Sequence, residues 1–164
     1  MKIVVSVDRN WAIGKDNKLL VRIPSDMQQF RNLTIGNVVI MGRKTFDSLP
    51  NHEPLEGRKN IILTRDENYT ARGVEVAHSV DELMDLIADV DTDSVFVIGG
   101  ATIYEQLLDK CDEAIITYID YEYQADTFFP NLEEREEWEL VEESDEKTYF
   151  DLEYYFRTYK RKAK

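Results

Sequence analysis

The chain has 164 residues, of which 33 are acidic and 20 are basic, and a formal net charge of -13 at pH 7. Its length suits one folded domain, 1–164, and its 43% hydrophobic residues argue against disorder. The negative charge disfavours general binding of nucleic acid or anionic membranes, and the single cysteine, Cys111, excludes an intrachain disulfide and a cysteine-based zinc cluster.

No membrane-spanning or targeting segment is expected. No stretch approaches the roughly 18 apolar residues that cross a bilayer, and the apolar run at 3–7 is too short for a signal peptide. We therefore expect a cytoplasmic protein. Adaptation to high salt would also account for the acidic excess, but the lysines that remain speak against it.

Apolar and β-branched runs predict strands throughout the chain. In order, they lie at 3–7, 37–41, 60–64, 74–77, 94–98 and 114–119. Most are apolar along their whole length, as in parallel strands that are covered on both faces. The aromatic-rich segments 138–141 and 149–160 predict an antiparallel pair near the C-terminus.

Helices are expected between these strands. They are predicted to follow Pro24, to occupy 43–49 before Pro50, to follow the capping signature of Ser79 and Glu82, and to occupy 101–108. The segment 10–18, with Gly14, Asp16 and Asn17, is predicted to be a loop. The predicted fold class is α/β: a single domain with a mainly parallel central sheet of about eight strands, an antiparallel C-terminal edge hairpin and flanking helices.

Asp26 lies on the apolar stripe of the helix that follows Pro24. Phe30 and Leu33 follow it at the i+4 and i+7 positions, so all three side chains face the same way. A buried carboxylate requires a hydrogen-bonding partner or a ligand. An acid in the first helical turn also complements the helix dipole, so its position alone leaves a structural and a functional interpretation open.

Two glycine turns follow buried strands, at the place where open α/β sheets collect ligands. They are Gly42 with Arg43, Lys44 and Thr45, and Gly99 with Gly100 and the residues up to Tyr104. Glycine permits a close approach of the backbone to a phosphate, and free N–H groups and cations attract anions. Each motif alone is more simply a turn. Both together suggest a ligand with several phosphates, which Arg65 could also contact unless it is an ordinary exposed arginine.

Other familiar catalytic machinery is not found in the sequence. There is no Walker loop, no dinucleotide fingerprint of three spaced glycines, and no acidic cluster that would predict a metal. His52 and His78 are the only histidines, and His78 is expected at the surface before a helix cap. Hydride transfer, in which a cofactor carries the reactivity, is therefore the reaction class favoured by elimination.

These motifs together resemble those of the dihydrofolate reductase family. The matching blocks, in family order, are 13–19, 23–30, 39–46, 57–64, 97–104 and 125–130, and they span nearly the whole chain. The resemblance implies NADPH-dependent reduction of 7,8-dihydrofolate to 5,6,7,8-tetrahydrofolate, with hydride transfer to C6 and protonation at N5. It also implies a role in one-carbon metabolism and thymidylate synthesis, a monomer, binding of antifolate inhibitors, and no metal.

On the substrate side, the resemblance assigns Asp26 to the pterin, where its carboxylate accepts hydrogen bonds and orients and polarises the ring. Thr117 would complete this contact, unless it is a plain inward-facing strand residue, and Arg58 would grip the glutamate carboxylate. Water beneath a closed loop would deliver the proton. The other implied substrate contacts, for which core packing is the alternative, are Val4, Val5, Met27, Phe30, Leu49 and Leu55.

On the cofactor side, Arg43 and Arg65 are implied near the 2'-phosphate or pyrophosphate, and the carbonyls of Val4 and Ile98 near the nicotinamide. The full implied set is Ser6, Ile13, Gly14, Leu19, Gly42, Arg43, Lys44, Thr45, Leu63, Thr64, Arg65, Ile98, Gly99, Gly100, Ala101, Thr102, Ile103 and Tyr104. Residues 12–20 resemble the mobile loop that closes over the active site.

The chain departs from the commonest family pattern at Val21. Most members have a tryptophan there, which packs the loop and helps to position a water near the pterin. Trp11 is not at the matching position, although it could pack nearby. Because Asp26, Arg58 and the phosphate segments remain, we expect activity. The alternatives are a reductase of the same fold that acts on a riboflavin precursor, which Arg58 fits less well, and a nucleotide-binding module without turnover.

Overall fold

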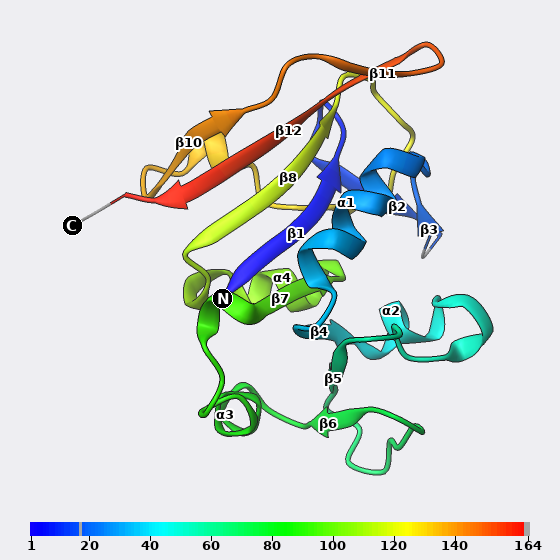
Figure 1. Ribbon diagram of the computed structural model, residues 1–164, viewed down its shortest axis with the longest axis vertical. Coiled ribbons are helices and arrows are strands. Elements are labelled where there is room, and N and C mark those ends of the chain that lie inside the picture. The colour runs from blue at the N-terminus through cyan, green and yellow to red at the C-terminus, as the bar shows by residue number, and fades with distance from the viewer. Residues whose placement is uncertain (17, 163–164) are drawn as a thin grey trace.

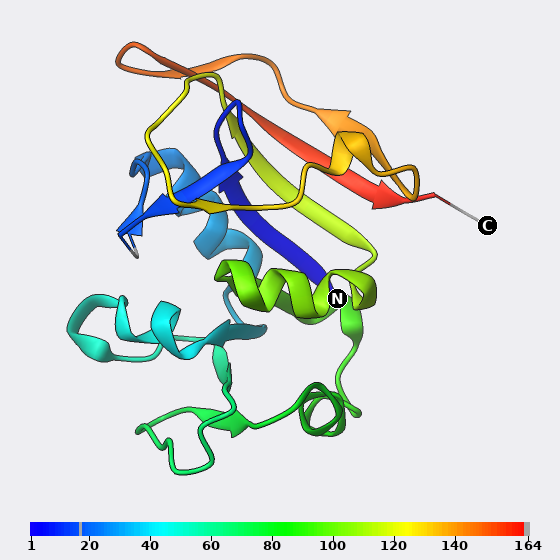
Figure 2. The same ribbon diagram turned by 180° about the vertical axis from the view of Figure 1, so that it is seen from behind.

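The structure, a computed structural model, describes residues 1–16 and 18–162. Its centre is a nine-stranded sheet with helices on both faces (Figures 1 and 2). Across the sheet the strands follow the order β10 (Trp138–Glu143), β12 (Leu152–Arg161), β8 (Glu113–Ile119), β1 (Lys2–Val7), β7 (Val95–Gly99), β4 (Val38–Gly42), β5 (Lys59–Leu63) and β6 (Glu75–Ala77), and β11 (Lys147–Tyr149) pairs with β12.

The sheet is parallel from β8 to β6 and antiparallel where β12 meets β8, β10 and β11. The predicted fold class is therefore confirmed. The apolar runs explain the result, since a parallel strand covered by helices on both sides has no face that water can reach. β4 illustrates this point, because every one of its residues is buried.

The helices divide between the two faces of the sheet. α1 (Pro24–Thr34) and α2 (Arg43–Asp47) cover one face, and α3 (Val80–Leu86) and α4 (Ala101–Leu107) pack on the other. Short 3-10 turns occupy Pro50–His52, Thr92–Ser94, Leu108–Lys110 and Leu132–Glu134. The capping signature before α3 is confirmed, because Ser79 Oγ accepts a hydrogen bond from the Glu82 N–H at 3.0 Å. In the described part of the chain, no helix is both long and apolar enough to span a membrane.

The prediction of a loop at 10–18 is wrong. Ala12–Lys15 forms β2 and Lys18–Leu19 forms β3, and with β9 (Thr127–Phe128) they make a separate three-stranded sheet. The partner strand β9 lies far away in the sequence, so no local pattern could reveal this pairing. Asn17, which was part of the predicted loop, lies outside the described residues.

The alternation of β1 decides which side chains can reach the α1 face. Ile3, Val5 and Val7 are buried in the core cluster that also contains α4, whereas Val4 packs against the cluster beneath α1. A period of two places Ser6 on the same face as Val4. Only the backbone of Val5 can therefore face a ligand beside α1.

Trp11 and Val21 lie in different parts of the core. The Trp11 ring stacks on Phe129 with centroids 6.2 Å apart and meets Tyr159 at 5.8 Å. Val21 packs instead against a small cluster that contains Ile23 and Tyr154. Trp11 is thus a core residue behind β1 and does not pack near position 21.

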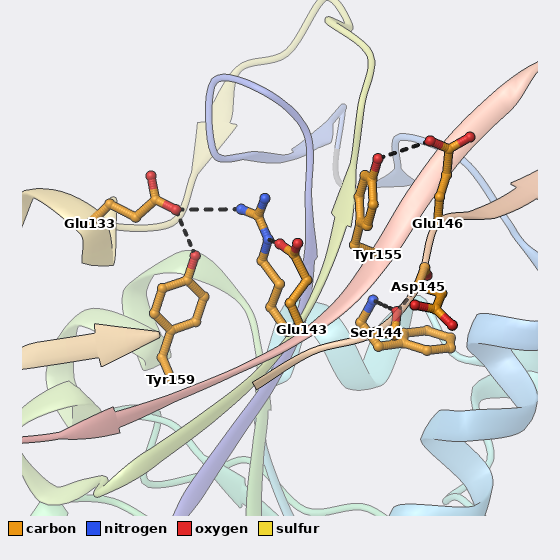
Figure 3. Close-up of polar contacts among 9 residues, drawn as sticks. Glu133, Glu143, Ser144, Asp145, Glu146, Tyr155 and Tyr159 are labelled. Atoms are coloured by element: carbon orange, nitrogen blue, oxygen red, sulfur yellow. Dashed lines mark hydrogen bonds and ion pairs between the residues drawn. The ribbon is translucent and has the colours of Figure 1, made fainter. Parts of the chain in front are cut away.

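A polar network joins the C-terminal hairpin to the turn at Leu132–Glu134. Glu133 Oε1 accepts hydrogen bonds from Tyr159 Oη at 3.0 Å and from Arg157 Nη1 at 3.4 Å, and Glu143 Oε2 accepts one from Arg157 Nε at 2.6 Å. Figure 3 shows Glu133 and Tyr159 facing each other across this edge. The guanidinium carbon of Arg157 also lies 4.0 Å from the centroid of the Tyr118 ring, so it joins β12 to β8.

Candidate active site

The carboxyl ends of β1 and β7 separate near the middle of the sheet. Their register covers only Lys2 with Phe96 and Ile3 with Val97, whereas β1 pairs with β8 along its full length. Beyond this point, the Tyr104 hydroxyl from α4 donates a hydrogen bond to the Val4 carbonyl at 2.8 Å. Ligands of open α/β sheets bind where neighbouring strands part in this way.

Asp26 points from the first turn of α1 onto the strands below it. Its Oδ1 accepts a hydrogen bond from Thr117 Oγ1 at 2.5 Å, and its Oδ2 accepts one from Ser6 Oγ at 2.7 Å. Ser6 and Thr117 are register partners on β1 and β8, so their side chains emerge side by side. The carboxylate is therefore held by the sheet, and complementing the helix dipole cannot be its whole role.

Ser6 has a different contact from the one implied by the resemblance. Its hydroxyl donates to the carboxylate of Asp26, whereas the resemblance implied a contact with the cofactor. The alternation of β1 could have placed Ser6 on the α1 face. Its pairing with Thr117, however, depends on which strand lies beside β1, which local sequence does not specify.

Arg58 is held over the end of α1. Its Nη1 donates to Thr34 Oγ1 at 3.1 Å and its Nε donates to the Glu56 carbonyl at 3.0 Å, and its guanidinium carbon lies 5.9 Å from the Phe30 ring centroid. Burial, and next the positive charge of Arg31, lower the pKa of Arg58. Arg31 was not among the predicted site residues, although it lies three residues before Thr34, which Arg58 contacts on α1.

Asn60 is a second residue of this region that was not among the predicted site residues. Its side chain is 2% exposed, and its Nδ2 donates to the carbonyls of Leu55 at 3.0 Å and Arg58 at 2.9 Å. Its Oδ1 accepts a hydrogen bond from the Leu55 N–H at 2.9 Å. This buried amide therefore fixes the loop that carries Leu55 and Arg58.

The apolar residues implied for the substrate side surround the same region. Val4, Leu49 and Leu55 are half-buried against the cluster of buried residues beneath α1. Phe30 is half-buried on α1, whereas Met27 is 47% exposed. Together with Asp26, Arg58 and Thr117, these side chains form what we call the substrate half of the site.

The two glycine turns meet at the ends of β4 and β7. A Cβ atom on Gly42 would lie 2.9 Å from Ile103 Cγ1, and one on Gly100 would lie 3.5 Å from Thr45 Oγ1. Gly99 has a φ of +126°, a backbone conformation that residues other than glycine rarely adopt. The turns and the cations around them, from Gly42 to Thr45, Leu63 to Arg65 and Ile98 to Tyr104, form the cofactor half of the site.

The cations of the cofactor half are exposed and loosely held. Arg43 Nη1 lies 3.5 Å from Asp66 Oδ2, and Arg43 Nε lies 4.0 Å from Asp47 Oδ2. Exposed ion pairs of this kind contribute little to stability and can open when an anion competes for the cation. His78, predicted to be a surface residue, is half-buried with its Nδ1 3.2 Å from the Thr64 carbonyl, beside the end of β5.

The segment 12–20 is fastened to the rest of the molecule at two points. Asp8 is fully buried, and its carboxylate accepts hydrogen bonds from the backbone N–H groups of Asn10, Ala12 and Tyr123 at 2.8 to 2.9 Å. Asp126 accepts a hydrogen bond from the Asp16 N–H at 3.0 Å, which is the main reason that the pKa of Asp126 is lowered. Between these points, Ile13 is half-buried and Leu19 is 61% exposed.

A hollow of about 620 Å³ lies elsewhere, between α1 and the C-terminal strands. Its walls include Gln29, Ile115, Glu142, Phe156 and Lys160. None of the implied site residues lines it, and its lining mixes apolar side chains with charges of both signs. The hollow therefore lies outside the candidate site.

Comparisons with known proteins identify the family of the chain. The family model described as dihydrofolate reductase matches residues 1–161. The chain is 36% identical over 141 residues to the dihydrofolate reductase of Staphylococcus aureus, covering 86% of this chain and 84% of that protein. It is 37% identical over 131 residues to dihydrofolate reductase type 3 of Salmonella typhimurium, and the match covers 80% of this chain and 78% of that protein.

The fold resembles a solved structure over almost its full length. Dihydrofolate reductase from Enterococcus faecalis, complexed with NADP(H) and RAB-propyl, matches with a TM-score of 0.87 and 32% sequence identity. The match covers 99% of this chain and 96% of that one.

Proposed function

This chain belongs to the dihydrofolate reductase family, and from that membership we propose how its own residues carry out the family's reaction. It reduces 7,8-dihydrofolate to 5,6,7,8-tetrahydrofolate with NADPH as the cofactor. The observation that carries the assignment of residues is the Asp26 carboxylate, with one strand hydroxyl on each oxygen. An ionised carboxylate has roughly four acceptor positions, so each oxygen can accept a further hydrogen bond from a ligand.

Asp26 binds and polarises the pterin. The 2-amino group and the adjacent ring nitrogen of the pterin present two donors side by side, which match the two carboxylate oxygens. Thr117 and Ser6 already direct their hydroxyls at those oxygens, so the carboxylate does not need to reorganise when the substrate arrives. Because Asp26 is committed to these donors, water delivers the proton to N5.

Arg58 and the apolar side chains of the substrate half hold the remainder of dihydrofolate. Two of the N–H groups of Arg58 are used within the protein, which leaves the others for the glutamate carboxylate. Arg31 adds a second positive charge there, as its effect on the pKa of Arg58 indicates. The walls around the pterin and benzoyl rings are Val4, the backbone of Val5, Met27, Phe30, Leu49 and Leu55.

The residues of the cofactor half fit a dinucleotide with several phosphates. NADPH, when bound, supplies the hydride from nicotinamide C4. The backbone N–H groups at Gly42 and at Gly99 to Thr102, with Thr45, bind the phosphates, and Arg43, Lys44 and Arg65 neutralise their charge. The remaining residues around the cofactor are Leu63, Thr64 and Ala101 to Tyr104. Ile13, Gly14, Leu19, Ile98 and the backbone of Ser6 border the nicotinamide, where β1 and β7 separate.

The segment 12–20 covers the reacting region and excludes water. Hydrogen bonds to Asp8 and Asp126 fasten this segment at Ala12 and Asp16, so its position over the ligands is set from both sides. Asp126 also donates its own N–H to the Gly14 carbonyl at 3.1 Å, so two hydrogen bonds join the same pair of segments. A closed segment strengthens the electrostatic contacts beneath it.

The direct test is oxidation of NADPH in the presence of dihydrofolate, which is monitored as the loss of NADPH absorbance. We expect turnover that requires both ligands and that falls sharply in Asp26→Asn. Tight binding of both ligands without turnover would instead favour an inert nucleotide-binding module. Turnover with a flavin precursor but not with dihydrofolate would favour the other reductase.

We also propose that the protein acts as a single-domain monomer in the cytoplasm. Both halves of the site come from one chain, so a second copy is not needed to complete it. Light scattering of the purified protein, with and without NADPH, tests the monomer, and a stable dimer would contradict it. Antifolate inhibitors that carry paired donors opposite Asp26 should compete with dihydrofolate and lose affinity in Asp26→Asn.

A further inference from the structure

Asp26 receives hydrogen bonds from two hydroxyl groups, one on each side of the carboxylate. Thr117 Oγ1 donates to Oδ1 over 2.5 Å, and Ser6 Oγ donates to Oδ2 over 2.7 Å. The donors lie opposite each other on two adjacent parallel strands. One rigid piece of sheet therefore holds both oxygens.

These hydroxyls are also the groups that offset the negative charge. Within residues 1–16 and 18–162, the ion pairs formed by lysine, arginine and histidine do not include Asp26. Thr117 is 4% exposed and Ser6 is half-buried, so water competes little for their hydroxyls. A hydrogen bond to a charged group is stronger in such surroundings than in water.

Two hydroxyls constrain the carboxylate in a way that one cannot. The torsion that turns a carboxylate about its Cβ–Cγ bond has broad minima, so a single hydrogen bond fixes one oxygen and leaves the plane free to rotate. A second donor on the other oxygen fixes the plane. Each oxygen still keeps a free acceptor position, and the two positions then point in constant directions.

We propose that Ser6 is a positioning residue for dihydrofolate reduction, which holds Asp26 Oδ2 so that both carboxylate oxygens keep one orientation toward the pterin. This inference rests on the proposed function of Asp26 as the pterin-binding carboxylate. Ser6 acts through Asp26 and touches no reacting atom. Its side chain thus serves the substrate half, and only its backbone borders the cofactor half.

The neighbouring Ser25 provides a matched control. It lies next to Asp26 on α1, but its hydroxyl forms a hydrogen bond with the Tyr154 hydroxyl and none with the carboxylate. Ser25→Ala removes the same hydroxyl oxygen as Ser6→Ala, from the residue next to Asp26 in the chain, and leaves both hydrogen bonds to the Asp26 carboxylate in place. Ser6→Thr restores a hydroxyl on a β-branched residue that suits a strand.

The experiment compares these variants by steady-state kinetics, by equilibrium binding of folate and NADPH, and by thermal unfolding. In Ser6→Ala we expect the affinity for folate and the kcat/KM for dihydrofolate to fall about three- to tenfold. The variant loses a hydrogen bond to the charged Asp26 carboxylate, and this loss affects the substrate only through the orientation of Asp26. The Kd for NADPH should stay unchanged. Ser6→Thr should recover most of the loss, and Ser25→Ala should resemble the unaltered protein.

A double-mutant cycle tests whether Ser6 acts through Asp26. In an Asp26→Ala background the acceptor is absent, so adding Ser6→Ala should cause no further loss of folate affinity. An equal additional loss in that background would overturn the proposal. A rise in the Kd for NADPH with unchanged folate binding would also overturn it, because Ser6 would then serve the nicotinamide.

The outcomes separate this proposal from the proposed function of Asp26. If Asp26→Ala leaves folate affinity intact, the assignment of Asp26 itself is wrong. If Asp26→Ala loses folate affinity but Ser6→Ala behaves like Ser25→Ala, only the role of Ser6 is wrong. Thermal unfolding identifies a variant that fails to fold, in which case Ser6→Thr and Ser6→Cys provide the comparison, since only the former retains a strong donor.

Discussion

The two halves of the site are built on different physical principles. In the substrate half, functional side chains are fixed by other groups of the protein: Asp26 by two strand hydroxyls and Arg58 by Thr34 and the Glu56 carbonyl. In the cofactor half, the backbone of two glycine turns supplies the shape, and exposed cations such as Arg43 supply the charge.

The contrast between the two halves predicts where a substitution should matter most. A preorganised side chain cannot be replaced by its neighbours, so its loss removes both a contact and an orientation. An exposed cation among several others is partly replaceable, because the field around an anion is a sum over many charges. Substitutions in the substrate half should therefore have the larger effects.

Asp26→Asn should have the largest effect. The amide keeps the shape but loses the charge and turns one acceptor into a donor, so we expect kcat/KM for dihydrofolate to fall about a hundredfold, in line with two charge-assisted hydrogen bonds. The loss should be greatest at high pH, where little of the substrate is already protonated. A pH–rate profile measures this, and a profile that matches the unaltered enzyme at every pH would contradict the role of Asp26.

Arg58→Leu should have the next largest effect. It removes a remote contact with the glutamate carboxylate, so we expect the KM for dihydrofolate to rise about tenfold while kcat changes little, the pattern of a lost uniform binding contact. Steady-state kinetics at saturating NADPH separates the change in KM from any change in kcat. Finding that NADPH affinity falls selectively would show that Arg58 has been placed in the wrong half.

Gly99→Ala tests the backbone of the cofactor half. Its φ of +126° disfavours any side chain, and the new Cβ would lie 3.3 Å from the Tyr104 hydroxyl. We expect a loss of about 1–3 kcal/mol in the free energy of unfolding and weaker binding of NADPH, with folate binding retained. The measurements are thermal unfolding and the Kd of each ligand.

The control for this change is Gly36→Ala. Gly36 also has a positive φ, +78°, but a Cβ there would meet nothing within 4 Å. This variant should lose stability without losing NADPH affinity. Equal losses of NADPH affinity in both variants would mean that general destabilisation, and not the turn at Gly99, is responsible.

Arg43→Gln should have the smallest effect. Its ion pairs with Asp66 and Asp47 are exposed, so stability should barely change. The Kd for NADPH should rise about three- to tenfold, and the rise should shrink as salt is added, because salt screens exposed charges. Titrations of NADPH at low and high salt measure this effect, and a salt-independent loss would indicate a direct structural role for Arg43.

Local patterns were sufficient for the parts of the site that depend on local structure. Gly42 and Gly99 follow buried strands, and α1 begins at Pro24 with Asp26 in its first turn, all of which periodicity and turn chemistry predict. Local patterns could not reveal that Ser6 contacts Asp26, that Asn60 holds the loop of Arg58, or that β2 pairs with β9. Each of these contacts depends on which segments become neighbours after folding.

The fold class, the family and the residue types available for binding a pterin and phosphates can all be read from local sequence. These follow from short-range periodicity, from glycine and proline at turns, and from motifs whose order survives along the chain. The partners of each functional group, such as the two hydroxyls on Asp26, depend on how the chain folds in three dimensions. The physical reason is that a hydrogen bond depends on distance and direction in space, and strand order and register set both.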